Sequence, residues 1–327
     1  GVGLYLLAAV VFFIVPIPSV LLDVMLAFNI SIALIIVFNV LFVREVLDMS
    51  FFPTLLLFTT IFRISLNVSS TRLILLTGDP GNVVKTFGSF VGGGNMVVGS
   101  IVFIVLVLIQ FIVINKGSER VSEVTARFTL DAMPGKQMAI DADLNTGAIT
   151  DAQAKERRQK LQDEASFFGS MDGAVKYVKG DATAGLIITG VNIIGGILMG
   201  MLRQGMDINS ALDKYVILTI GDGLVSQIPS LLISLSTGIL VTKGSKEADF
   251  GTVLVKQLFG LPKVLYMVGA VLVFLGIVTP LNNLIFLPLG GIFIICGRMI
   301  ANTIETAQIE TQADTEAVSY THLTLPT

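Results

Sequence analysis

The sequence predicts an all-α membrane protein with about eight transmembrane helices and a helical cytoplasmic loop. Of its 327 residues 53% are hydrophobic and 14% are charged, against roughly 25% charged in ordinary soluble domains. The mean hydropathy is +0.84. The long apolar runs do not alternate with polar residues as barrel strands do, so helices must satisfy the backbone in lipid. These features exclude a soluble enzyme, a disordered chain and a secreted disulfide scaffold.

The predicted spans follow the apolar runs, each of which must cross about 30 Å of hydrocarbon. The first run is too short to cross alone, and Gly1 is not a start methionine, so we expect residues to be missing before it. We place the spans at 2–15, 19–43, 51–76, 97–115, 183–202, 215–241, 261–280 and 284–301. This gives two four-helix units, 1–115 and 183–301, on either side of a hydrophilic loop, 116–182.

Lysine and arginine residues predict the orientation, because they concentrate on the cytoplasmic side. With the N-terminus inside, 16 basic residues are cytoplasmic: Arg44, ten in 116–182, four in 242–263 and Arg298. Only 3 are outside: Lys85, Arg203 and Lys214. We therefore expect both termini and the 116–182 loop in the cytoplasm, and without the loop the count is still 6 to 3.

Two helices are predicted in the loop. Val121, Val124 and Phe128 recur at helical spacing, which indicates an amphipathic helix that Met133-Pro134-Gly135 should end. Thr150 is the expected N-cap of a second helix that runs to about residue 162. We expect the loop to lie against the membrane domain or a partner.

The chain turns polar after Ala301. Residues 302–318 are predicted to begin a solvated cytoplasmic linker. Residues 319–327 fit nothing before them, and we interpret them as a non-native tail.

Several kinds of chemistry have no support in the sequence. One cysteine, Cys296, and one histidine, His322, exclude a His/Cys metal site and a catalytic triad. Lys85-Thr86 follows valine instead of the glycine of a phosphate loop. Residues 141–145 imitate half a calcium loop, but Thr146 and Ala152 replace its glycine and glutamate. We expect no cofactor, no metal, no catalytic residue and no nucleic-acid partner.

Charged residues inside the spans are the main functional candidates. A central arginine such as Arg63 costs about 2.5–3.5 kcal/mol on insertion scales, so it needs a partner or water. Arg72 lies about 13 Å further along and points the opposite way, with Ser65 and Ser69. The third span should therefore be buried among other helices. A polar stripe on it comprises Thr59, Arg63, Asn67 and Ser70.

Two carboxylates complete this set. Asp222 is followed at steps of four by Ser226, Ser230 and Ser234, and Pro229 should break the helix and free a carbonyl, as at ion sites. Asp181 lies at the entry to the fifth span, just after Lys176 and Lys179. The alternative for Asp181 is a solvated interfacial residue. For the serines, and for Gly196 with Gly200, the corresponding interpretation is simple helix packing.

The loop carries a more specific signal. Residues 120–143, RVSEVTARFTLDAMPGKQMAIDAD, closely resemble the signature of the FlhA/FHIPEP family, the export-gate family of type III secretion. The sequence of this segment is more similar to flagellar members of the family than to virulence members. Other similar stretches are 63–72, 87–95, 169–174, 179–182 and 221–229.

The resemblance implies a ring of about nine copies in the bacterial inner membrane. It implies partnership with other export-gate membrane proteins and a soluble ATPase complex, and coupling of the proton motive force to export of unfolded proteins. The large soluble domain of family members would follow the linker, so this chain would be the membrane half. By motif, the proton-linked residues would be Arg63, Arg72, Lys176, Asp181 and Asp222. The loop's coupling residues would be Arg120, Glu123, Arg127, Asp131, Lys136, Asp141 and Asp143.

Two other functions remain open on the sequence. A proton-coupled secondary transporter of a small ion or solute would also carry intramembrane charges and a broken helix. Inverted repeats would favour it, and none is convincing between 1–115 and 183–301. A scaffold whose charges only pack is the third possibility.

Overall fold

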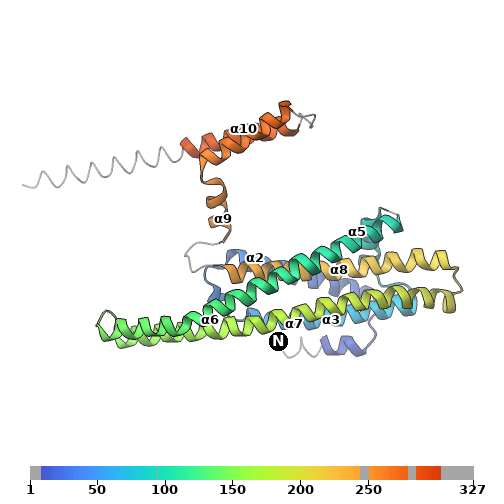
Figure 1. Ribbon diagram of the computed structural model, residues 1–327. Helices are drawn as coiled ribbons and strands as arrows, with labels where there is room; N and C mark the ends of the chain where they lie inside the picture. Colours follow the sequence, from blue (N-terminus) through green and yellow to red (C-terminus); the bar gives the residue numbers. More distant parts are fainter. Residues whose placement is uncertain (1–8, 94, 244–249, 279–284, 303–327) are drawn as a thin grey trace, which may run out of the picture. The chain divides into compact units, whose positions relative to one another are not determined.

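The computed structural model describes residues 9–93, 95–243, 250–278 and 285–302, and within these ranges every regular element is a helix. The chain divides into two compact units, Gly1–Glu247 and Ala248–Thr327. The first contains helical residues 9–14, α2 (Ser19–Phe42), the 3-10 helix η1 (Val46–Met49), α3 (Phe52–Thr77), α4 (Asn82–Gly92), α5 (Met96–Leu108), the π-helix η2 (Ile109–Asn115), α6 (Lys116–Asn145), α7 (Asp151–Gln204) and α8 (Ile208–Thr242) (Figure 1). The second contains α9 (Phe250–Phe259), α10 (Pro262–Val278) and the helix Ile285–Asn302.

Among the described residues, six helical stretches are long and apolar enough to cross a membrane: Ser19–Phe42, Val46–Thr77, Met96–Asn145, Asp151–Gln204, Ile208–Thr242 and Ile285–Asn302. The prediction of an all-α polytopic membrane protein is confirmed. Half of the predicted first span, residues 2–8, lies outside the described residues, and residues 9–14 are helical. The predicted seventh span corresponds to α10, whose 17 described residues form an apolar helix of about 26 Å.

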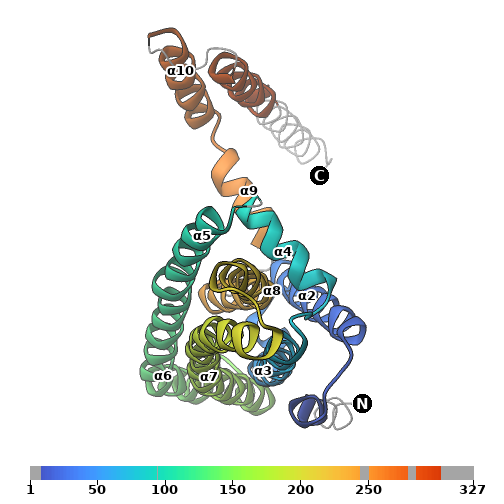
Figure 2. The same cartoon turned by 90° about the vertical axis from the view of Figure 1, so that its right-hand side faces the viewer.

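Helix α8 is the centre of the first unit. It contacts α2, α3, α4, α5, α6, α7 and η2, and the end-on view shows it surrounded by neighbouring helices (Figure 2). Small residues permit the closest approach. A Cβ on Gly221 of α8 would lie 1.9 Å from the carbonyl oxygen of Val84, and one on Gly88 of α4 would lie 2.2 Å from that of Ile217. Close packing at Gly196 and Gly200 is also confirmed, because both glycines lie against the ring of Tyr215.

Helix α4 lies in a stretch that the sequence analysis left without an element. Its first amides bind a side chain from another helix: Asn82 and Val83 donate to the carboxylate of Asp23 at 2.8 and 3.0 Å. This tertiary cap supplies the acceptors that helix N-termini need. Gly81 enters the helix at φ +109°, where a Cβ would lie 2.4 Å from that carboxylate.

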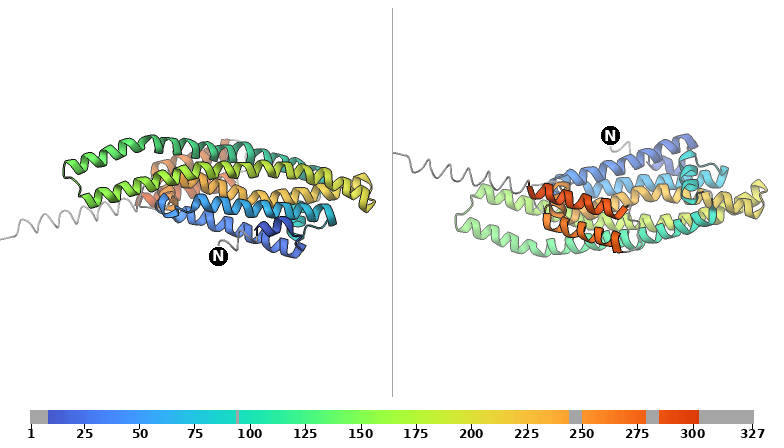
Figure 3. Two further views of the ribbon diagram at one scale, coloured as in Figure 1. Left: turned by 90° about the horizontal axis from the view of Figure 1, so that it is seen from below. Right: turned by 90° about the horizontal axis from the view of Figure 1, so that it is seen from above.

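Helices α6 and α7 form an antiparallel hairpin, seen side by side in Figures 1 and 3. Thr150 caps α7 in a capping box with Gln153, as predicted. The predicted break at Met133-Pro134-Gly135 is wrong, because α6 continues through Pro134 to Asn145. Proline removes one donor, which leaves the carbonyl of Leu130 without its usual helical partner. Leu130 is 39% exposed, so water can satisfy that oxygen.

The buried face of α6 also differs from the prediction. Val121 and Phe128 are 37% and 70% exposed, whereas Ser122 and Ala126 are 1% and 3% exposed. A helix was correctly predicted to begin here. Its small residues, and not the predicted apolar stripe, face the neighbouring helices. Small side chains allow two long helices to approach closely.

One apolar core joins the base of the hairpin to the membrane helices. Phe167, Met171 and Val175 of α7 belong to the same buried cluster as Phe52 and Leu56 of α3. The hairpin therefore lies against the bundle, as expected. Positions 115 and 182 fall at a helix–helix junction and inside α7, so the backbone passes without a loop from hairpin to bundle.

Candidate functional site

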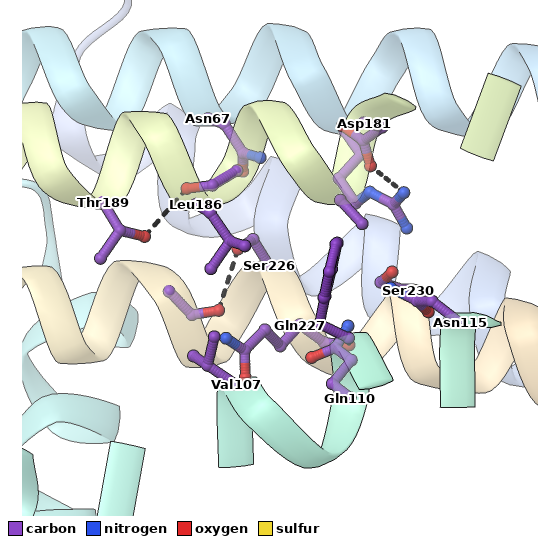
Figure 4. A pocket seen from close by; sticks show the side chains of 15 residues that line it. Asn67, Val107, Gln110, Asn115, Asp181, Leu186, Thr189, Ser226, Gln227 and Ser230 are labelled. Atoms are coloured by element: carbon purple, nitrogen blue, oxygen red, sulfur yellow. Dashed lines mark hydrogen bonds and ion pairs between the residues drawn. The ribbon is translucent and has the colours of Figure 1, made fainter. Parts of the chain in front are cut away.

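A polar cavity lies inside the first unit, where α3, α5, α7, α8 and η2 meet (Figure 4). Its volume is about 50 Å³, and one water needs roughly 10–15 Å³ on this measure. The cavity therefore has room for a few waters. Its polar lining comes from Arg63, Asn67, Gln110, Asn115, Asp181, Thr189, Ser226, Gln227 and Ser230.

A buried ion pair forms one wall of the cavity. The guanidinium of Arg63 on α3 binds the carboxylate of Asp181 on α7. Arg63 is 2% exposed and Asp181 is 6% exposed, so the interfacial, solvated alternative for Asp181 is wrong. The pair satisfies the requirement that an intramembrane arginine be compensated.

Three polar atoms around the cavity have no protein partner. Nη1 of Arg63, Oδ1 of Asp181 and Oγ of Ser230 are buried and make no hydrogen bond within the described residues. Buried polar groups are generally bonded to protein or to ordered water. The unpaired atoms and the cavity volume together indicate a hydrated site.

The predicted stripe on α3 is buried along its length. Thr59, Arg63, Asn67 and Ser70 are between 0% and 7% exposed. Arg63 and Asn67 line the cavity, while Ser70 lies further along, near Asp222. The predicted periodicity is therefore confirmed as a protein-facing side of α3.

Asp222 forms a separate polar cluster. Its carboxylate accepts a hydrogen bond of 3.0 Å from Nδ2 of Asn192 on α7, and Ser70 lies within hydrogen-bonding reach. No ion pair in the described part of the chain includes Asp222. Arg63 pairs with Asp181 and not with Asp222. The predicted helix break at Pro229 is wrong, because α8 runs unbroken from Ile208 to Thr242.

Arg72 does not approach either carboxylate. Its Nη1 and Nη2 donate to the carbonyls of Ile14 and Phe13 at 3.0 and 2.8 Å. Ser69 donates to the carbonyl of Phe12 at 2.9 Å. The second side of α3 therefore holds the end of helix 9–14, whose last carbonyls lack helical partners.

Lys176 and the charged loop residues lie on the hairpin surface. Lys176 binds Asp172 at 2.6 Å, one turn away, and does not pair with Asp181. Arg120 and Arg127 flank Glu123, at 3.0 and 3.6 Å, and Asp131 is exposed. Four pairs in the described residues join the two helices across the hairpin: Glu119–Lys179, Lys136–Glu164, Asp141–Arg158 and Asp143–Arg157.

Several polar residues of these sites were not predicted from the sequence, among them Thr189 and Gln227 at the cavity. Three amides are buried most deeply. Asn192 is fully buried beside Asp222, and Gln110 and Asn115 are each 8% exposed at the cavity. Each is a lone amide inside or at the end of an apolar run, and this is the signal that could have identified it. No group of three or more metal-binding side chains gathers in the described residues.

Comparison with known proteins identifies the family. The model of the FHIPEP family matches residues 9–323. The chain belongs to the FHIPEP family. It is 56% identical over 279 residues, 85% of the chain, to the flagellar biosynthesis protein FlhA of Bacillus subtilis. It is 50% identical over 84% of the chain to the protein of the same name from Salmonella typhimurium.

Identity is lower to a relative with a different name, the low calcium response locus protein D of Yersinia pestis, at 44% over 96% of the chain. The higher identity to the two flagellar biosynthesis proteins favours the flagellar type, as predicted. The chain spans 40–45% of the length of these three relatives. No solved structure matches the chain.

Proposed function

We propose that this chain is the membrane part of a flagellar-type protein export gate, and that it couples the proton motive force to export of unfolded proteins. The observation that carries this proposal is the buried Arg63–Asp181 pair beside a polar cavity with room for a few waters. Two of its relatives are named flagellar biosynthesis proteins, and we take flagellar export as the process from these names.

The arrangement suggests how a proton would act. If Asp181 takes up a proton, Arg63 loses its counter-charge inside a low-dielectric bundle, and breaking such a pair costs about 3–5 kcal/mol in proteins. The site must then rearrange or take up water. One charge that moves through 100 mV yields about 2.3 kcal/mol, so a few protons supply energy of this size.

Helix α7 is the element that would carry the rearrangement. Asp181 lies on the same continuous helix that forms one arm of the hairpin, and the thirty residues from Asp151 to Asp181 span about 45 Å. A shift or tilt at Asp181 would therefore move the hairpin directly. Asp222 on α8, held by Asn192 about three turns further along α7, provides a second carboxylate for proton transfer.

The surroundings of the chain are part of the proposal. We place it in the bacterial inner membrane with both termini and the hairpin in the cytoplasm, because the basic residues cluster there. It would work as a ring of about nine copies, with other export-gate membrane proteins and a soluble ATPase complex. The exposed charges of the hairpin, including Arg120 and Asp131, are suited to contacts with such partners.

The test measures export in cells whose only copy of the protein is the full-length variant. Asp181→Asn and Asp222→Asn should abolish proton-dependent secretion, while the amount of protein in the membrane stays at the wild-type level. Asp131→Asn, at an exposed hairpin position, is the matched acid-to-amide control and should retain export. Normal export by both Asp181→Asn and Asp222→Asn would refute the proposal.

The transporter alternative loses one of its supports, because the helix at Pro229 is continuous. Purified protein in vesicles distinguishes the two functions. Flux of a small solute driven by a proton gradient, without any other export protein, would favour the transporter.

A further inference from the structure

The π-helix η2 joins α5 to α6 without a loop. The N–H of Lys116 donates to the carbonyl of Phe111, five residues earlier, which is the π-helical hydrogen bond. A π turn holds an extra residue within an otherwise α-helical stretch, and such turns are rare and frequently lie at functional sites. The extra residue here lies between the cavity and the hairpin.

The π turn brings two amides to the same side of the helix. Gln110 and Asn115 are five residues apart, so an α-helix would point them about 140° away from each other. In η2 both line the cavity and both are 8% exposed. Figure 4 shows the two labelled side chains at this site.

Both amides contact α8. Gln110 Nε2 lies 3.5 Å from the carbonyl oxygen of Gln227, and Asn115 Oδ1 accepts a hydrogen bond of 3.1 Å from Ser234. Ser118, in the first turn of α6, donates to the carbonyl of Ser234 at 3.0 Å. The cavity, η2 and the start of α6 therefore share one set of contacts with α8.

The other side of η2 gives no reason for a π turn. Ile112 and Val113 are apolar and 54% and 62% exposed, and such side chains fit a regular α-helix in lipid equally well. The effect of the extra residue is confined to the polar side.

We propose that Gln110 and Asn115 are positioning residues of the Arg63–Asp181 cavity, and that the π turn both holds them there and links the cavity to α6. This inference rests on the proposed function. If η2 became α-helical, the residues beyond it would turn by about 100° and shift by about 1.5 Å per residue of register. Asn115 would leave the cavity and α6 would rotate, so the state of the cavity would reach the hairpin through α6 as well as α7.

The first test deletes Ile112 in the full-length protein. Because η2 contains one extra residue, the deletion should give a continuous α-helix with α5 and α6 still in their original register. Gln110 and Asn115 would then be four residues apart and would both still face the cavity. We expect wild-type amounts in the membrane but a loss of export, because no π turn would remain that could become α-helical. Register is checked by cross-linking Ser118→Cys to Ser234→Cys in a Cys296→Ser background, and the cross-link should persist.

The matched control deletes Ile104, which is 56% exposed and lies in the regular part of α5. That deletion removes the same side chain from a similarly exposed apolar site. It should turn one part of the helix against the other by about 100°. We expect the Ser118–Ser234 cross-link to be lost in this variant only.

A second test distinguishes positioning from general stability. In Gln110→Leu and Asn115→Leu we expect export to need a larger proton motive force, measured as the protonophore concentration that halves secretion. Asn115→Gln, which keeps the amide, should restore part of the wild-type dependence. A purely structural role would lower the amount of protein without shifting that concentration.

The outcomes separate the two proposals. If the Ile112 deletion exports normally with unchanged protonophore dependence while Asp181→Asn does not export, the role of the π turn is refuted and the proposed function stands. Loss of the cross-link in the Ile112 deletion would equally refute it, because the turn would not be a removable single-residue insertion. Normal export by Asp181→Asn refutes the assignment of the site, and the inference with it.

Discussion

Two arginines of α3, nine residues apart, have opposite roles in the structure. Arg63 is 2% exposed, binds the carboxylate of Asp181 and lines a polar cavity. Arg72 binds two backbone carbonyls at the end of helix 9–14. Both looked equivalent as charges within an apolar span. The two arginines differ in their partners: Arg63 binds an ionisable carboxylate, whereas Arg72 binds carbonyls, which do not titrate.

The largest effect should come from Arg63→Leu. It leaves Asp181 as an uncompensated buried charge, for which about 3–5 kcal/mol of destabilisation is typical. Resistance of the purified protein to SDS unfolding measures this loss, and export should disappear.

The double variant Arg63→Leu/Asp181→Leu sharpens the comparison. Replacing both partners by apolar groups is often neutral or stabilising, so stability should return while export does not. Recovery of export by the double variant would mean that the pair only packs.

Arg72→Leu should act mainly on stability. Hydrogen bonds from a charged donor contribute about 1.5–3 kcal/mol each, and their loss should release helix 9–14. Ala9 is fully buried, so labelling of Ala9→Cys by a maleimide should rise. Arg72→Lys should give an intermediate result, since lysine lacks the planar fork that spans two acceptors.

Ser69→Ala removes one neutral hydrogen bond to the same helix end. We expect about 1 kcal/mol of destabilisation and a smaller rise in Ala9→Cys labelling than Arg72→Leu produces. An effect as large as that of Arg72→Leu would contradict the division of roles on this side of α3.

The smallest effect is expected at Asp79, an exposed acid that contrasts with Asp181. A hydrogen bond from Lys85, 2.8 Å away, holds the pKa of the Asp79 carboxyl below its ordinary value. Because that pKa is lowered in the folded state, the pair stabilises at neutral pH and loses this contribution as the pH falls through the lowered pKa. Surface pairs contribute about 0–1 kcal/mol, so Asp79→Asn should barely change SDS resistance or export.

The sequence predicted the helices better than their contacts. Apolar runs gave the membrane helices, and the steps from Thr59 to Ser70 gave the buried stripe, since both depend only on local periodicity. The loop carries the sequence signature that indicated the family. Thr150 was recognised as a cap because capping is also a local interaction.

The misses have tertiary causes. Pro134 and Pro229 each looked like a break, but an isolated proline within a long, supported helix removes only one backbone donor. The Arg63–Asp181 pair joins residues 118 positions apart, and no local pattern fixes such a pairing. The role of Gln110 and Asn115 depends on a π turn, which periodicity counted at 3.6 residues cannot show.

Under the proposed function, the Arg63–Asp181 pair passes the state of the proton gradient to the hairpin. The most direct test measures the Ser118→Cys/Ser234→Cys cross-link, in a Cys296→Ser background, in energised membranes before and after a protonophore is added. The account predicts that the yield changes when the gradient collapses, and that Asp181→Asn removes this response while leaving the protein in the membrane. An identical response in Asp181→Asn, or none in the wild-type background, would contradict it.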